Sequence, residues 1–164
     1  MNVLLYRGLE EKTMRLNNWI SVARSLLTNG PSYLIFQVTS QCNSRCLTCF
    51  NWKRIDSTEK NDLTLDEIEK ISENYGRILQ LTLGGGEPFL RDDIADICQL
   101  FDRNNSVQHI TIPTNCLLPN TIKKAVENIL LRCNLNYLKI GLSLDGIGEE
   151  HDRLRGVPGN YKKY

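Results

Sequence analysis

The amino-acid sequence predicts an α/β protein, a partial (β/α) barrel of about four βα units preceded by an N-terminal helix. Strand-like and helix-like segments alternate along residues 33–164, which is typical of βα units that form a parallel sheet. Polar and apolar residues also alternate within the strands: Gln80 and Thr82 share one face, and Leu81 and Leu83 share the other. Strands buried on both faces are almost continuously apolar, so one face of a curved sheet is expected to enclose a polar cavity. An antiparallel sheet with one solvated face would show the same alternation, but it would not need the intervening helices.

Composition and charge exclude several classes of function. With 164 residues, 41% of them hydrophobic and 24% charged, the chain resembles one ordinary globular domain. Twenty basic and nineteen acidic residues leave a net charge of +1, which disfavours partners such as nucleic acid or an anionic membrane. The apolar run Val3-Leu4-Leu5 is too short for a signal peptide, and no run approaches the length of a membrane span. We therefore expect a cytoplasmic protein whose six cysteines are thiols or metal ligands rather than disulfides.

The segment before the first strand is expected to form an amphipathic helix from about Glu10 to Leu27. Asn29-Gly30-Pro31 ends this helix. Its polar face is not strongly basic, so we expect it to pack against the rest of the chain rather than on a membrane. We divide the chain accordingly into an N-terminal helical extension, residues 1–30, and a core domain, residues 31–164, that is truncated at its C-terminal side. The apolar positions of the helix are Leu16, Trp19, Ile20, Ala23, Leu26 and Leu27.

The core domain is predicted to contain four strands separated by helices. Thr64-Leu65-Asp66-Glu67 has the form of a capping box and begins the first helix. Asp92 is expected to cap the second helix, and residues 118–121 lead into the third. Cys98 and Cys133 fall on the apolar stripes of these two helices, so both are predicted to be core residues. The predicted strands are Tyr33–Ser40, Arg77–Leu83, Val107–Thr114 and Tyr137–Leu144.

Four motifs lie at the carboxyl ends of these strands. Right-handed crossovers place the carboxyl ends of parallel strands on one rim of a sheet, and in βα barrels this rim carries the active site. We therefore expect the four motifs to converge on one site. They are the cysteines at 42, 46 and 49, the run Gly84-Gly85-Gly86-Glu87-Pro88, Thr114-Asn115-Cys116, and Ser143-Leu144-Asp145-Gly146.

Cys42, Cys46 and Cys49 lie within eight residues, so one loop can wrap three sulfurs around one object. Soft thiolates favour an iron-sulfur cluster or zinc over a hard cation. A closed zinc site needs a fourth protein ligand. A [4Fe-4S] cluster normally takes four thiolates, so three would leave one iron open to a substrate or cofactor. The candidates for a distant fourth zinc ligand are His109, His151 and Cys116.

The glycine run admits two interpretations. Consecutive glycines let the main chain approach a ligand without interference from Cβ atoms, and Pro88 keeps Glu87 extended. A flexible turn is the alternative. No Lys-Ser or Lys-Thr follows the run, so a nucleotide-binding P-loop is disfavoured.

With these motifs on one rim, residues 33–164 resemble the radical S-adenosylmethionine (SAM) superfamily. The Cys-x3-Cys-x2-Cys spacing matches the cluster loop of that family, and Gly85-Gly86-Glu87 looks like its amino-group-binding motif. The segments 143–146 and 151–156 resemble the branch that includes peptide-modifying and cofactor-maturing enzymes. The fold that this resemblance implies is a partial radical SAM barrel.

The resemblance implies a [4Fe-4S] cluster bound by the three cysteines, with SAM chelating the open iron. Reductive cleavage of SAM would then give a 5'-deoxyadenosyl radical that abstracts hydrogen from a substrate, such as a peptide. A reductant such as flavodoxin or ferredoxin would supply the electron. The implied SAM contacts are Gly85, Gly86 and Glu87 for the amino group, Ser143 and Asp145 for the ribose, and Arg155 for the carboxylate.

The chain departs from the family pattern in three respects. Thr48 precedes the third cysteine where many members carry an aromatic residue, and Cys116 stands where a glycine is usual. The family barrel typically has six βα units, and this sequence supplies four. The last strand would then have an unpaired edge, which natural proteins normally cover. We therefore expect the front portion of a larger enzyme, or a second chain that supplies the missing half of the barrel.

An alternative function is a non-catalytic zinc- or cluster-binding module that binds a partner, or an inactive fragment of a larger enzyme. The glycine run and Ser143-Leu144-Asp145-Gly146 favour the enzyme, because a structural metal site requires neither motif.

Overall fold

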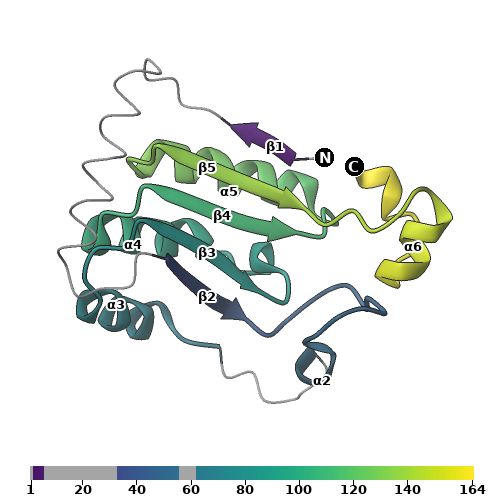
Figure 1. Ribbon diagram of the computed structural model, residues 1–164, viewed down its shortest axis with the longest axis horizontal. Helices are drawn as coiled ribbons and strands as arrows, with labels where there is room; N and C mark the ends of the chain where they lie inside the picture. The colour runs from purple at the N-terminus through teal and green to yellow at the C-terminus, as the bar shows by residue number, and fades with distance from the viewer. Residues whose placement is uncertain (1, 6–32, 56–61) are drawn as a thin grey trace.

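The computed structural model describes residues 2–5, 33–55 and 62–164 (Figure 1). The predicted helix at residues 10–27 lies outside these described residues. None of the helices within them is long and apolar enough to span a membrane. The elements are β1 (Asn2–Leu5), β2 (Tyr33–Thr39), α2 (Trp52–Ile55), α3 (Leu65–Asn74), β3 (Gln80–Gly85), the 3₁₀-helix η1 (Pro88–Leu90), α4 (Ile94–Asn105), β4 (His109–Thr114), α5 (Pro119–Arg132), β5 (Tyr137–Leu142), α6 (Glu149–Arg155) and the 3₁₀-helix η2 (Tyr161–Lys163).

The described strands form one sheet in the order β1-β5-β4-β3-β2. Strands β2 to β5 are parallel to one another, which confirms the predicted α/β fold. Helices α3, α4 and α5 pack next to one another, and Figure 1 shows α4 and α5 behind the sheet. The main core lies between these helices and one face of the sheet. Its fully buried side chains include Ile68, Leu81, Ile97, Phe101, Ile110 and Ile129.

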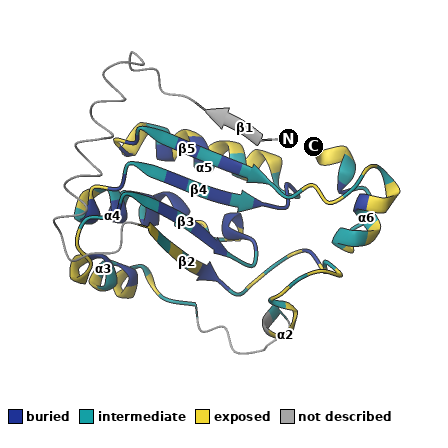
Figure 2. Cartoon of the chain, in the orientation of Figure 1, coloured by how far each residue is buried: buried dark blue, intermediate teal, exposed yellow. Residues whose placement is uncertain are grey.

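Burial alternates along the strands as the sequence predicts (Figure 2). Leu81 and Leu83 are completely buried beneath the helices, whereas Thr82 between them is partly exposed. On the same open face, Ile35 of β2 is 56% exposed. Among the described strands, one face of the sheet is therefore less covered than the other, whereas the polar cavity that this face is expected to enclose stays a prediction.

Local signals set the starts of two helices. Thr64 caps α3 through the predicted capping box: its hydroxyl accepts from the Glu67 N–H, and the Glu67 carboxylate accepts from the Thr64 N–H at 2.8 Å. The predicted cap of α4 was wrong by one residue. Asp93 occupies that position, but it makes no side-chain cap because its carboxylate binds the Arg91 guanidinium.

The edge of β5 is paired, contrary to the prediction of an exposed last strand. Strand β1 runs antiparallel to it, with Val3 opposite Ile140 and Leu5 opposite Leu138. The physical reason is that residues 2–5 are extended and, apart from Asn2, apolar, and they satisfy backbone groups that β5 would otherwise expose. Strand β2 forms the opposite edge of the described sheet.

Candidate metal and cofactor centre

The three cysteines lie on the loop that leaves the carboxyl end of β2 (Figure 1). All three are half-buried free thiols. The register between β2 and β3 shifts between Gln37 and Thr39, shortly before the loop begins. Thr39 still pairs with Gly85 of β3, so the cysteine loop starts from a residue held in the sheet.

The end of α6 holds the middle of this loop. The Ser44 hydroxyl donates to the Arg155 carbonyl at 2.7 Å, and the Arg45 N–H donates to the same oxygen at 3.2 Å. The Leu47 N–H donates to the Leu154 carbonyl at 2.9 Å. Two segments far apart in sequence, the cysteine loop and the 151–156 motif, are thus joined by main-chain contacts.

Gly156 is required by this junction. Its φ of +66° is in the left-handed region, and a Cβ there would lie 2.3 Å from the Arg45 carbonyl oxygen. Only glycine permits both the backbone conformation and the close approach. The sequence motif at 151–156 contains Gly156 without indicating its role, but a glycine directly after a short helix is a recognisable sign of a helix C-terminus.

The glycine run fits tightly against the chain that leads to Cys42. A Cβ at Gly85 would lie 2.1 Å from the Thr39 oxygen, and one at Gly86 would lie 2.0 Å from the Gln41 oxygen. The N–H groups of Gly86 and Glu87 donate to these same two oxygens at 2.8 Å. The glycines therefore permit a close main-chain contact inside the protein, and their contact with a ligand stays a prediction.

Glu87, just after β3, forms hydrogen bonds with residues at the end of β4. Its side chain is 2% exposed. One carboxylate oxygen accepts from the Thr114 hydroxyl at 2.9 Å and the Phe89 N–H at 3.3 Å, and the other accepts from the Asn115 N–H at 2.8 Å. Burial raises the pKa of Glu87, and these hydrogen bonds offset part of that rise. The protein itself already engages the carboxylate.

Asp145 and Arg155 form an ion pair, although the family resemblance implies separate roles for them. The Arg155 Nη1 donates to the Asp145 carboxylate at 3.0 Å. Burial lowers the pKa of Arg155, but the hydrogen bond to Asp145 and the nearby acidic groups of Cys46, Asp145 and Tyr164 together outweigh burial, so the net shift is upward. The Nε of Arg155 is buried and has no hydrogen-bond partner within the described chain. One donor of this guanidinium is therefore available to a ligand.

Ser143 lies beside this pair and is fixed through its main chain. Its N–H donates to the Thr114 carbonyl at 3.0 Å, and its carbonyl accepts from the Tyr164 hydroxyl at 2.9 Å. The structure thus brings the ends of β4 and β5 together with the C-terminal segment.

Cys116 has a φ of +59°, the left-handed region that glycine favours. This explains physically why a glycine is usual at this position. The thiol is buried, and burial raises its pKa to about 11. Since the thiolate is the reactive form, this environment disfavours a reactive role. Cys98 and Cys133 are 0% and 4% exposed, so the prediction that both are core residues is confirmed.

The structure does not bring the two histidines to the cysteines. His109 is the first residue of β4, at the end opposite the cysteine loop. Both ring nitrogens of His151 are engaged: Nδ1 accepts from the Asp145 N–H at 3.2 Å, and Nε2 pairs with the Asn160 Oδ1 at 3.1 Å. Within residues 2–5, 33–55 and 62–164, no three His, Cys, Asp or Glu side chains converge on one metal ion.

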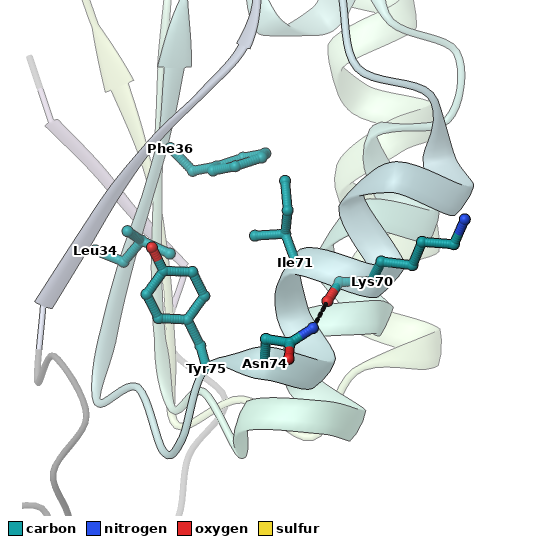
Figure 3. Close-up of a pocket in the computed structure, with 6 residues that line it drawn as sticks. All are labelled: Leu34, Phe36, Lys70, Ile71, Asn74 and Tyr75. Atoms are coloured by element: carbon teal, nitrogen blue, oxygen red, sulfur yellow. Dashed lines mark hydrogen bonds between the residues drawn. The ribbon is translucent and has the colours of Figure 1, made fainter.

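A separate apolar pocket of about 440 Å³ lies between β2 and α3 (Figure 3). It is on the helix side of the sheet, where Phe36 packs edge-to-face against Phe101 at 5.5 Å. Leu34, near the start of β2, places the pocket away from the cysteine loop. Its lining residues are Leu34, Phe36, Lys70, Ile71, Asn74 and Tyr75.

Comparison with known proteins defines the class. The family model described as "Radical SAM superfamily" matches residues 36–164, and the chain belongs to this superfamily. Its members are enzymes that use a [4Fe-4S] cluster and SAM.

Individual relatives have different activities. The chain is 37% identical over 87 residues to GTP 3',8-cyclase of Cronobacter sakazakii, covering 51% of this chain and 26% of that protein. It is 28% identical over 142 residues to AdoMet-dependent heme synthase of Methanosarcina barkeri, covering 84% of this chain and 38% of that protein. The chain therefore spans about a quarter to two fifths of these relatives.

The fold is also that of a solved structure bound to S-adenosylmethionine. Streptococcus suis SuiB bound to S-adenosylmethionine aligns with a TM-score of 0.60 at 23% identity, covering 94% of this chain and 36% of that chain. SuiB bound to the precursor peptide SuiA aligns with a TM-score of 0.57 at 24% identity. These alignments show the fold.

Proposed function

We propose that this chain is the front part of a radical SAM enzyme in which Cys42, Cys46 and Cys49 ligate a [4Fe-4S] cluster. The observation that carries the proposal is one loop with three free, half-buried thiols, fixed to both the glycine run and α6. Cubane clusters take their cysteines on different irons, so the sulfurs need not converge on one point as they would around a single zinc ion. The residues present fit the cluster.

We assign the SAM contacts to the rim that surrounds this loop. When bound and reduced, the cluster supplies the electron that cleaves SAM to methionine and a 5'-deoxyadenosyl radical. The main chain at Gly85 and Gly86, with Glu87, would hold the amino group. Arg155, whose buried Nε lacks a partner among the described residues, would bind the methionine carboxylate. Ser143 and Asp145 would bind the ribose hydroxyls.

We propose a peptide as the substrate class. The support is the likeness to SuiB, which was solved with a precursor peptide. The less covered face of the sheet carries Gln37, Thr82, Thr111 and Lys139, and their polar groups can pair with peptide amides. The names of the two other relatives, GTP 3',8-cyclase and AdoMet-dependent heme synthase, do not mention a peptide.

We further propose that residues 1–30 form an extension of a core domain at 31–164, and that a further segment or a second chain completes the barrel. Completion at β5 would require β1 to leave that edge, because β1 pairs with it here. We assign the protein to the reducing cytoplasm because its six cysteines are free, with flavodoxin or ferredoxin as electron donor.

Anaerobic reconstitution with iron and sulfide, followed by dithionite and SAM, tests this function. We expect a brown protein that forms 5'-deoxyadenosine, and loss of that product in Cys46→Ala. Cys133→Ala is the matched control, since Cys133 ends α5 in the core, and it should retain the cluster. Colourless protein with one zinc per chain would instead support the non-catalytic module.

A further inference from the structure

The sulfur of each loop cysteine has polar groups beside it. Most of these groups belong to the cysteine loop itself, including the Ser44 N–H beside Cys42, whereas Asn115 reaches Cys42 from the end of β4. The pairs are Asn51 N–H with Cys49 Sγ at 3.3 Å, Ser44 Oγ with Cys46 Sγ at 3.3 Å, and Asn115 Nδ2 with Cys42 Sγ at 3.9 Å.

The orientation of the Asn115 amide is fixed by its other contacts. Its Oδ1 accepts from the Leu117 N–H at 3.0 Å, which only an oxygen can do. The nitrogen must therefore point toward Asn43, whose Oδ1 accepts at 2.8 Å, and toward the sulfur of Cys42. The residue is 3% exposed, so water does not compete for this donor.

The main chain of Asn115 is held as firmly as its side chain. Its N–H donates to Glu87 at 2.8 Å, and its carbonyl accepts from Asn160 Nδ2 at 2.9 Å and the Tyr164 hydroxyl at 3.3 Å. Contacts from β3 and from the C-terminal segment thus fix the position of the donor. An amide fixed this way keeps its place when the charge on the sulfur changes.

We propose that Asn115 is a positioning residue that raises the reduction potential of the cluster by donating an N–H···S hydrogen bond to Cys42. The inference rests on the proposed function, because it requires a cluster on this loop. Hydrogen bonds to cluster sulfurs are one of the means by which proteins set reduction potentials. The bond strengthens as the sulfur gains negative charge, so it stabilises the reduced cluster more than the oxidised one.

The test is a redox titration of the reconstituted protein, monitored by the EPR signal of the reduced cluster. Asn115→Asp keeps the acceptor for Leu117 but replaces the donor with a negative charge, and Asn115→Ala removes the donor without adding charge. We expect both variants to assemble the cluster and both midpoint potentials to shift to more negative values. The matched control is Asn136→Asp, which adds the same charge beside the start of β5 and should leave the potential unchanged.

A second measurement needs no variant. In wild-type protein carrying ¹⁵N only in its asparagine side-chain amides, pulsed EPR of the reduced cluster should detect a weakly coupled nitrogen. Absence of that coupling, or an unchanged potential in Asn115→Ala, would overturn the role of Asn115 alone. Wild-type protein that binds no cluster would overturn the proposed function as well, so the two failures are distinguishable.

Discussion

At the scale of single residues, Cys116 illustrates how backbone conformation and side-chain chemistry can conflict. A non-glycine residue in the left-handed region costs roughly 1–2 kcal/mol, and Cys116 adopts that region with a φ of +59°. Its thiol is buried next to Glu87, and its pKa is about 11. The residue therefore carries backbone strain without the reactivity that a cysteine at this rim could offer.

Cys116→Gly should leave the free energy of unfolding unchanged or raise it by up to about 1 kcal/mol, because relief of roughly 1–2 kcal/mol of strain offsets the entropy cost of glycine and the loss of a small buried side chain. Urea unfolding measures the change. Cys133→Gly is the matched control: its φ of −109° is ordinary for any residue, so glycine there should lower the free energy of unfolding. Equal destabilisation in both variants would show that Cys116 is not strained.

The carboxylate of Asp62 binds the segment Thr39–Gln41, which connects β2 to the cysteine loop. It accepts from the Ser40 N–H at 2.8 Å, and from the side chains of Thr39 and Gln41. Burial raises the pKa of Asp62, but these hydrogen bonds outweigh it and the net shift is downward. Because the folded pKa is depressed, the stabilisation is present above the unfolded value of about 3.9 and is lost as the pH falls through the folded pKa.

Asp62→Asn should therefore cost about 1 kcal/mol at neutral pH, and the cost should shrink as the pH falls below about 4. The reason is that wild-type Asp62 itself becomes protonated in that range. Urea unfolding of both proteins at a series of pH values gives the difference. A cost that stays constant down to the acid limit would rule out the ionised carboxylate as the source of the stabilisation.

The sequence predicts those site residues that directly follow a strand. The cysteines, the glycine run and Ser143 come at strand ends, so a correct strand prediction places them on one rim. The sequence could not predict the contacts between segments that are far apart along the chain. Asp62 lies 22 residues from its partner Ser40, and Ser44 lies 111 residues from Arg155. Such pairs depend on the tertiary arrangement of loops, for which the sequence carries no periodic signal.

At the scale of elements, the junction between the cysteine loop and α6 depends on one glycine. Gly156 and Gly159 both have positive φ values, +66° and +78°. A Cβ at Gly156 would collide with the Arg45 oxygen, whereas nothing lies within 4 Å of a Cβ at Gly159. An alanine at Gly159 would therefore cause backbone strain alone, whereas an alanine at Gly156 would cause both strain and a steric collision.

Gly159→Ala should cost about 1 kcal/mol through strain alone. Gly156→Ala should cost a further 1–3 kcal/mol, because the collision must push the loop away from α6. Thermal unfolding measures both, and iron content after reconstitution should fall only in Gly156→Ala. Equal stability and equal iron content would show that the close approach does not hold the cysteine loop.

At the scale of the whole molecule, the two edges of the described sheet differ. Strand β1 covers the edge of β5 with four residue pairs, and β2 forms the other edge. The sequence predicts the four parallel strands but not β1, because a segment as short as Asn2–Leu5 shows too little alternation to be recognised. Pairing across more than 130 residues is decided by which backbone groups remain unsatisfied, which only the assembled sheet reveals.

Replacement of residues 2–5 by Gly-Ser-Gly-Ser should promote self-association, because an uncovered edge offers its N–H and carbonyl groups to another chain. Glycine and serine keep the chain length but have low strand propensity, so the edge of β5 at Leu138–Gly141 would be exposed. Size-exclusion chromatography with light scattering over a range of concentrations measures the effect. Replacement by Thr-Val-Thr-Val is the matched control and should stay as monomeric as wild type. If the Gly-Ser variant stays equally monomeric, β1 does not protect this edge, and a further segment could pair with β5 without first displacing it.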